Sequence, residues 1–136
     1  MTNPRSQFFA CFAVCSSVLA TLSAFGQPVI HEELKIVPED PELWDAFGSY
    51  TAINGNIAVI GVPSDDDNGN ISGSAYLFDT KDGQQLRKLT PDDAASGDIF
   101  GEAIAINGDM LVIGAPGNDD DGFNSGCVYI FDLITG

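Results

Sequence analysis

The sequence predicts an all-β fold of two four-stranded antiparallel blades that form an incomplete or open part of a β-propeller. The main observation is an internal repeat. Residues 47–83 match residues 100–136 without a gap, at a shift of 53, with 19 of 37 positions identical. A period near 50 residues lies in the range of propeller blades. The second observation is that each copy consists of short apolar segments separated by Gly-rich turn sequences, which is typical of antiparallel strands.

Each strand of the first unit is predicted from its local pattern. Four segments have strand composition: 49–53, 56–61, 74–79 and 85–89. Asn54-Gly55 between the first two is a strong hairpin signal, because both residue types tolerate positive φ. The second segment is almost continuously apolar, as expected for a strand covered on both faces. The fourth is more polar, which indicates an edge strand that meets water.

The second unit repeats this order but has only three of the four strands. The segments 101–106, 109–114 and 126–131 repeat the first three strands, and the sequence stops at Gly136 before a fourth. Conversely, residues 33–37 align with 86–90 and are predicted to be a fourth strand that precedes its own unit. Two blades do not close a ring, since known propellers have about four or more. The alternatives are a truncated reading frame, which is the plainest, an assembly, or a small open sheet pair.

Composition restricts the function classes. The 136 residues contain 20 Asp+Glu and 5 Lys+Arg, which gives a formal net charge of -15. Nucleic-acid binding needs a basic face, so no nucleic-acid partner is expected. The hydrophobic fraction of 44% is that of a globular chain rather than a disordered one.

The N-terminus is predicted to be a signal peptide, residues 1–26. Arg5 precedes the apolar run 8–22, and small residues frame a cleavage site before Gln27. The mature protein is then residues 27–136, secreted or at the cell surface, with no stable membrane span after signal cleavage. A retained membrane anchor is the alternative. Cleavage leaves Cys127 as the only cysteine, and its apolar surroundings in the sequence indicate a buried small hydrophobe.

The repeated motifs resemble those of the FG-GAP repeat family. Phe47-Gly48 and Phe100-Gly101 are its Phe-Gly element, Gly114-Ala115-Pro116 is its Gly-Ala-Pro element, and Gly61-Val62-Pro63 is a degraded copy. The chain is similar to the bacterial secreted branch of this integrin-alpha-like family, with repeat units at about 35–87 and 88–136. The resemblance implies propeller blades and an extracellular adhesion, binding or structural role. Its partners would be an extracellular protein or glycan, further blades, or a second copy.

Two acidic loops are the candidate metal site. Calcium binds six to eight oxygen ligands, and clustered carboxylates on a Gly-containing loop are the right ligand type. The candidate Ca²⁺ ligands are Asp65, Asp66, Asp67, Asn68, Asn118, Asp119, Asp120 and Asp121. The alternative is a pair of solvated acidic turns, because Asp, Asn and Gly also suit turn conformations. In integrins the calcium loop precedes the Gly-Ala-Pro element, whereas both of these loops follow it.

No catalytic residues are predicted, and we expect a binding or structural protein rather than an enzyme. His31 has no Cys or Ser partner nearby in the sequence from which a triad could be assembled. Trp44 is expected either to stack on a sugar or to cap the core between blades. The alternatives are a fragment or subunit of an extracellular propeller-type hydrolase or lyase, or a truncated, non-functional reading frame.

Overall fold

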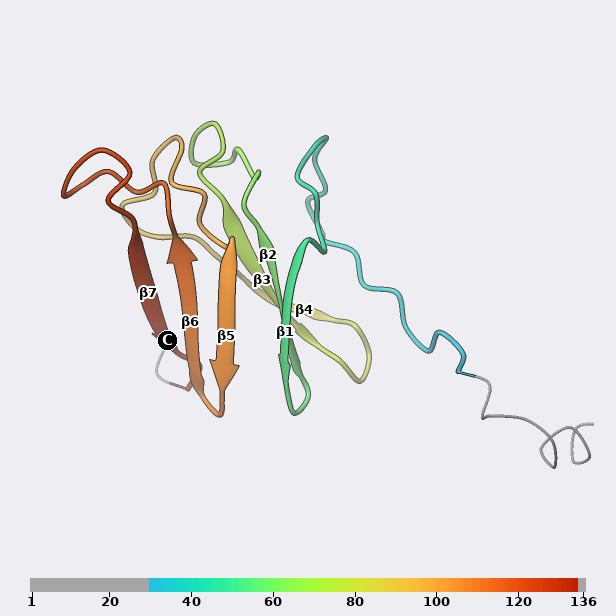
Figure 1. Cartoon of the computed structure of the whole chain (residues 1–136). Coiled ribbons are helices and arrows are strands. Elements are labelled where there is room, and N and C mark those ends of the chain that lie inside the picture. The colour runs from blue at the N-terminus through green and yellow to red at the C-terminus, as the bar shows by residue number, and fades with distance from the viewer. Residues whose placement is uncertain (1–29, 135–136) are drawn as a thin grey trace, which may run out of the picture. The chain divides into compact units, whose positions relative to one another are not determined.

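The computed structural model describes residues 30–134, and this part of the chain is all-β without a helix. The seven strands are β1 (Tyr50–Asn54), β2 (Ile57–Val62), β3 (Ser74–Asp79), β4 (Gln85–Leu89), β5 (Ala103–Asn107), β6 (Met110–Ala115) and β7 (Cys127–Asp132). They form one sheet in the order β1-β2-β3-β4, the first blade, and a second in the order β5-β6-β7, the second blade. All pairs are antiparallel, so the predicted fold class is confirmed (Figure 1).

The chain divides into two units, residues 1–33 and 34–136, and both blades belong to the second. Of the first unit only residues 30–33 are described, and they have no regular secondary structure. The predicted signal peptide, residues 1–26, lies outside the described residues. Within residues 30–134, no helix has the length and apolar character to cross a membrane.

The two blades are copies of one backbone unit. Strands β5, β6 and β7 begin and end one repeat length after β1, β2 and β3. Unusual backbone conformations recur at the same shift: Gly73 and Gly126 both have positive φ, and so do Ile71 and Asn124. The sequence repeat is therefore a structural repeat, including its loops.

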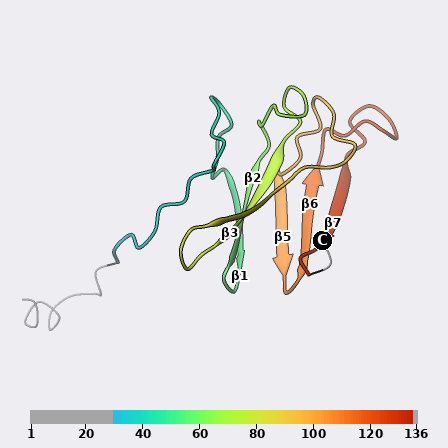
Figure 2. The ribbon, with the colours of Figure 1, turned by 180° about the vertical axis from the view of Figure 1, so that it is seen from behind.

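The blades pack face to face through one shared core. The first blade contributes Val59, Ala75, Leu77 and Leu89, and the second contributes Phe100, Leu111, Ile113 and Ala115. Strand β1 contacts β5, so the two sheets lie side by side at their first strands (Figure 2). Phe100 is fully buried and makes edge-to-face contacts with Tyr129 and Phe131, at ring centroid distances of 5.4 and 6.2 Å. The Phe-Gly element thus supplies a wedge between the blades.

Backbone hydrogen bonds also join the blades. The amides of Gly97, Ile99 and Phe100 donate to the carbonyl oxygens of Asn70, Ile71 and Ser72, at 2.9, 3.1 and 3.0 Å. Gly73 forms a parallel bridge with Phe100, and a Cβ at Gly73 would overlap the Phe100 carbonyl. Glycine is required at this position by the close approach of the second blade and by its positive φ.

The prediction of a strand at residues 33–37 is wrong. This segment has no strand hydrogen bonds. It meets the first blade through side chains instead: Leu34 lies against Gly83, and just after the segment the Glu39 amide donates to the Gln85 side chain of β4 at 3.0 Å. Ile36 nevertheless packs on the first blade's other apolar face, beside Phe47 and Tyr76. The counterpart of Ile36 in the next repeat is Leu89. Ile36 packs on the first blade in the same way as Leu89 packs on the second.

Candidate functional site

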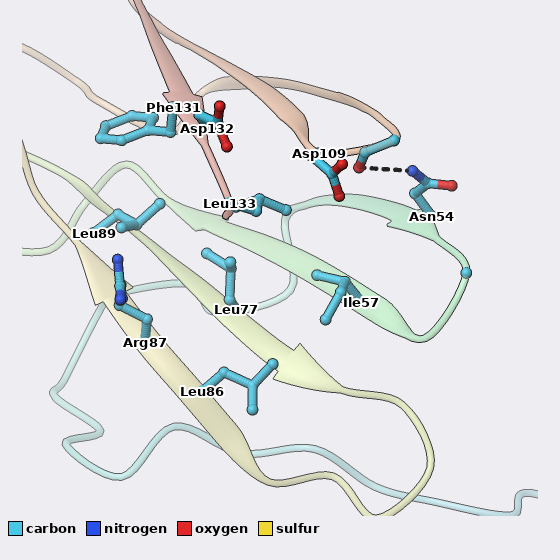
Figure 3. Close-up of a pocket in the computed structure, with 12 residues that line it drawn as sticks. Asn54, Ile57, Leu77, Leu86, Arg87, Leu89, Asp109, Phe131, Asp132 and Leu133 are labelled. Carbon is cyan, nitrogen blue, oxygen red and sulfur yellow. Dashed lines mark hydrogen bonds between the residues drawn. The ribbon is translucent and has the colours of Figure 1, made fainter. Parts of the chain in front are cut away.

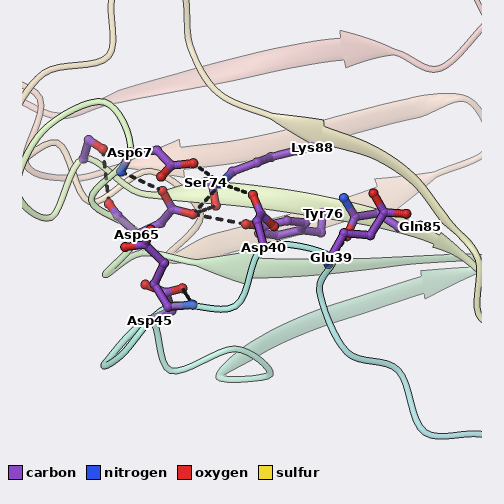
Figure 4. A network of polar contacts seen from close by, with 11 residues as sticks. Glu39, Asp40, Asp45, Asp65, Asp67, Ser74, Tyr76, Gln85 and Lys88 are labelled. Atoms are coloured by element: carbon purple, nitrogen blue, oxygen red, sulfur yellow. Dashed lines mark hydrogen bonds and ion pairs between the residues drawn. The ribbon is translucent and has the colours of Figure 1, made fainter.

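The first acidic loop is built around a buried carboxylate. Asp65 follows β2 in a turn, where its amide donates to the Val62 carbonyl, and this turn directs its side chain beneath the loop. Its Oδ2 accepts hydrogen bonds from Ser74 Oγ at 2.8 Å and Tyr76 Oη at 3.2 Å. Its Oδ1 accepts from the Asp67 amide at 3.1 Å. Both oxygens therefore have partners within the protein (Figure 4).

Lys88 supplies the positive charge of this loop. From β4 its Nζ reaches Asp40, Asp65 and Asp67, at 2.9, 2.9 and 2.6 Å (Figure 4). Its ammonium group also lies 5.0 Å from the ring centroid of Tyr76, within cation–π range. The Lys88 side chain is only 19% exposed and that of Asp65 only 4%. One lysine thus bridges three carboxylates, of which only Asp65 is buried, and offsets part of their charge.

The electrostatic effects follow from this geometry. Burial opposes ionisation of Asp65, but hydrogen bonds from Lys88, the Asp67 amide and Ser74 outweigh it and lower the pKa of Asp65. Burial likewise opposes ionisation of Asp40, and its hydrogen bonds with Lys88 and Tyr76 outweigh this effect and lower the pKa of Asp40. Burial disfavours the charged form of Lys88, yet its contacts with Asp67, Tyr76, Asp65 and Asp40 raise the pKa of the lysine. Burial raises the pKa of Tyr76 to about 12. The pKa shifts of Asp40, Asp65 and Lys88 therefore all favour the charged forms of these groups, and the shift of Tyr76 favours its neutral form.

The second acidic loop has the same backbone but different chemistry. Asn118 takes the place of Asp65 and is buried, and Cys127, which is half-buried, takes the place of Ser74. Tyr129 donates to Asp93 Oδ1 at 2.9 Å. Among the described residues no lysine occupies the place that Lys88 has in the first blade.

The predicted calcium ligands fall into two groups. Asp65 and Asn118 are buried at the base of the loops, whereas the other six are exposed on the loop tips: Asp66, Asp67, Asn68, Asp119, Asp120 and Asp121. Asp66 Oδ1 accepts the Ile71 amide at 2.7 Å. Within residues 30–134, no three His, Cys, Asp or Glu side chains are grouped as a metal site. Calcium binding stays a prediction.

A cleft between the blades is the second candidate site. It includes the turns of the β1-β2 and β5-β6 hairpins, at the end of the strands opposite the acidic loops (Figure 1). Its volume is about 510 Å³ (Figure 3). Its apolar lining residues are Ile57, Leu77, Leu86, Leu89, Phe131 and Leu133, and its polar side chains are Asn54, Arg87, Asp109 and Asp132. Asn54 Nδ2 donates to the Gly108 carbonyl at 3.0 Å and links the two hairpins at the rim.

Sequence reasoning missed Lys88 and the cleft. The repetition of Lys35 as Lys88 and of Asp40 as Asp93 is the signal that points to a charged position shared by both units. The cleft had no such signal, because its lining comes from five strands and two hairpin turns. Trp44 does not cap the core: it is exposed and has a positive φ of 78°.

Comparison with known families decides the relationship of this chain. The family model described as FG-GAP repeat matches residues 30–78 and 84–131, which is more than half of the sequence. The chain belongs to the FG-GAP repeat family. The first match contains β1, β2 and almost all of β3, and the second contains β4 followed by β5, β6 and almost all of β7. Each FG-GAP match therefore covers three strands of one sheet together with the segment that precedes them, and β4 of the first blade falls in the second match. Searches of curated proteins and of solved structures find no match.

Proposed function

We propose that this FG-GAP protein is an extracellular binding module that holds part of a protein or glycan ligand in the cleft between its blades. The observation that carries the proposal is the lining of this cleft. Apolar side chains from both blades form its floor, and charged side chains stand at its rim. Ligand sites commonly combine such an apolar surface with a few polar groups that orient the ligand.

The chemistry of the cleft suits a flat or branched apolar group with polar edges. Leu77, Leu89 and Phe131 offer a surface for an apolar side chain or a sugar face. Arg87 offers a donor fork on one side, and Asp109 offers acceptors on the other. A peptide side chain or a sugar ring fits this pattern of an apolar face with hydrogen-bonding edges.

Binding is favoured over catalysis by how the carboxylates are engaged. Asp65 is neutralised by Lys88, and Asp132 Oδ1 accepts the Ile134 amide at 2.8 Å. These contacts stabilise loops and hairpins, which is a structural use of charge. A hydrolase and lyase screen of the exported protein tests the rival function, and robust turnover would refute a binding role.

A matched pair of variants tests the cleft. Leu86 lies in the cleft and is 47% exposed, whereas Leu43 lies outside it and is 88% exposed. Arrays of extracellular proteins and glycans would first give a ligand. Leu86→Asp should then weaken binding at least about tenfold, because it places a charge on the apolar floor, and Leu43→Asp should not. Equal affinity of both variants would place the ligand elsewhere.

Export is part of the same proposal. N-terminal sequencing of protein recovered from outside the producing cell should begin near Gln27, which would separate a cleaved signal peptide from a retained anchor. Intact N-termini on exported protein would contradict cleavage.

A further inference from the structure

We propose that the chain self-associates head to tail, so that the first blade of one copy packs on the second blade of another copy. The contact would repeat the one that joins the two blades within the chain. It uses the free face of the second blade, defined by Gly114, Gly126, Val128 and Ile130, and the residues that precede the first blade. This proposal concerns a different surface from the cleft, so each can fail alone.

The free face is apolar and uncovered in the described chain. Val128 and Ile130 are 62% and 64% exposed. Their counterparts in the first repeat, Ala75 and Leu77, are buried against the second blade. The same face is therefore a packed interface in one blade and open in the other.

A hollow on the free face matches the Phe-Gly element. In the first blade, Cβ atoms at Gly61 and Gly73 would overlap the backbone of Phe100-Gly101, which fills this space. The counterparts, Gly114 and Gly126, meet no such backbone and instead line a hollow of about 540 Å³. Gly114 has no positive φ that would by itself require glycine. Phe47-Gly48 of a second copy is the equivalent of the Phe100-Gly101 wedge.

A second hollow matches a lysine. It has a volume of about 450 Å³, and Asp93 and Tyr129 are among its lining residues. In the first blade, the counterparts Asp40 and Tyr76 surround Lys88. The counterpart of Lys88 one repeat earlier is Lys35, which is exposed and has no ion pair in the described part of the chain. Lys35 of a second copy would bring the missing cation.

The outer edge of β7 supplies a register for this docking. Strand β4 pairs with β3 so that Leu89 faces Ala75, Lys88 faces Tyr76 and Arg87 faces Leu77. When this register is shifted by one repeat of 53 residues, it places Ile36 of a second copy opposite Val128 of the first. Lys35 then faces Tyr129, and Leu34 faces Ile130. No strand of the described chain occupies this edge. An added strand would pair its unpaired backbone groups.

The docking segment needs no rearrangement. Ile36 already packs on the apolar face of its own first blade, as Leu89 packs on the face of the second blade. Within the chain, the Leu89 side chain packs on the second blade while the backbone of its strand, β4, pairs with β3. Ile36 can therefore keep its present contacts while its backbone pairs with β7 of the neighbouring copy.

A head-to-tail contact uses two different surfaces, so it propagates until a ring closes. Propellers have about four to eight blades, and two blades per copy therefore predict a ring of about two to four copies. The neighbour is a second copy because this chain itself carries the wedge, the lysine and the apolar segment that the free face lacks.

Analytical ultracentrifugation and light scattering of the chain at ~100 μM test the proposal. The chain should form a discrete oligomer. Lys35→Glu should weaken the association at least about tenfold, because it places a carboxylate beside Asp93 and Asp120. Val128→Glu should do the same from the other surface. Lys81→Glu, an identical charge change in an exposed turn, should leave the oligomer intact. Thermal melting checks that each variant is folded.

Mixing the two defective variants tests the head-to-tail geometry. The Lys35→Glu variant keeps an intact free face, and the Val128→Glu variant keeps an intact docking segment. An equimolar mixture should therefore form a one-to-one pair that grows no further. A monomeric wild-type chain would overturn the proposal. This holds even if the β7 amides of the monomer are protected from hydrogen exchange, because another segment of the same chain would then cover the edge. An oligomer insensitive to both variants would overturn it as well.

Discussion

Lys88 Nζ lies 2.9 Å from Oδ2 of Asp65, and this contact joins the edge strand β4 to the base of the first acidic loop. The same ammonium group also contacts Asp40 and Asp67, so it offsets part of the charge of three carboxylates. In an acidic loop that resembles a metal site in sequence, the buried carboxylate is thus paired, in the first blade, with the protein's own lysine. The loop geometry depends on a strand that comes well after the loop in the sequence.

Removing the lysine should therefore destabilise the first blade. Lys88→Met keeps much of the apolar stem but leaves Asp65 buried without its counter-charge. Losing one partner of a buried ion pair typically costs about 3–5 kcal/mol, and the partial exposure of this cluster reduces that to about 2–3 kcal/mol. Urea unfolding measures the loss. Lys81→Met, at an exposed turn, is the control and should stay within about 0.5 kcal/mol of the wild type.

A second substitution separates charge from packing. The second blade has Asn118 where the first has Asp65, so the backbone accommodates asparagine. Asp65→Asn in the Lys88→Met background should recover at least about 1 kcal/mol, because it removes the unpaired buried charge. No recovery would show that Lys88 stabilises the blade through its stem alone.

Stability should fall in acid. The folded-state pKa values of Asp40 and Asp65 lie below the unfolded value of about 3.9, so their contribution is present above about pH 3.9. It is lost as the pH falls through the lower folded values. Lys88 has the opposite sign: its pKa is raised, so its contribution is complete below about pH 10.4 and is lost only as the pH rises above that.

Urea midpoints between about pH 2 and 7 measure this dependence. The wild type should lose stability below about pH 4, and the difference between the wild type and the Asp65→Asn variant should shrink over the same range. Parallel curves at all pH values would contradict the role of Asp65.

The sequence was sufficient for the fold because the information was local and duplicated. Asn54-Gly55 and the apolar segment after it place the first hairpin, and the repeat predicts the first three strands a second time. The predicted strands agree with the observed ones to within two residues at each end. Residues 33–37 were the exception, because a strand needs a paired edge as well as a strand-like composition.

The site was harder to predict because its partners are distant in sequence. Composition placed Asp65 in an exposed metal loop, whereas packing of Ser74 and Tyr76 buries it beneath that loop. The repeat shows that Lys88 and Asp40 have counterparts, but only the register of β4 on β3 shows that they meet.

Calcium binding at the loop tips has a thermodynamic signature. A site that exists only in the folded protein adds RT ln(1 + [L]/Kd) to the free energy of unfolding. For a Kd of ~0.1–1 mM, 10 mM Ca²⁺ should add about 1.4–2.7 kcal/mol. Melting with Ca²⁺ and with chelator measures this shift.

The control for calcium is a variant without the exposed carboxylates of the second loop. Replacing Asp119, Asp120 and Asp121 together by Asn should remove that loop's share of the shift. An unchanged melting temperature of the wild type at ~10 mM Ca²⁺ would favour solvated acidic turns.

The close approach at Gly73 gives a direct measure of the contact between the blades. Gly73 and Gly55 both have positive φ, at 83° and 58°, so alanine is strained at either position. That strain costs about 1 kcal/mol. Around Gly55 a Cβ would meet nothing within 4 Å, whereas at Gly73 it would overlap the Phe100 backbone. Gly73→Ala should therefore cost at least about 2 kcal/mol more than Gly55→Ala, because the blades must separate to admit the methyl group. Urea unfolding compares the two variants. Equal losses would mean that the parallel bridge between Gly73 and Phe100 does not hold the blades together in solution.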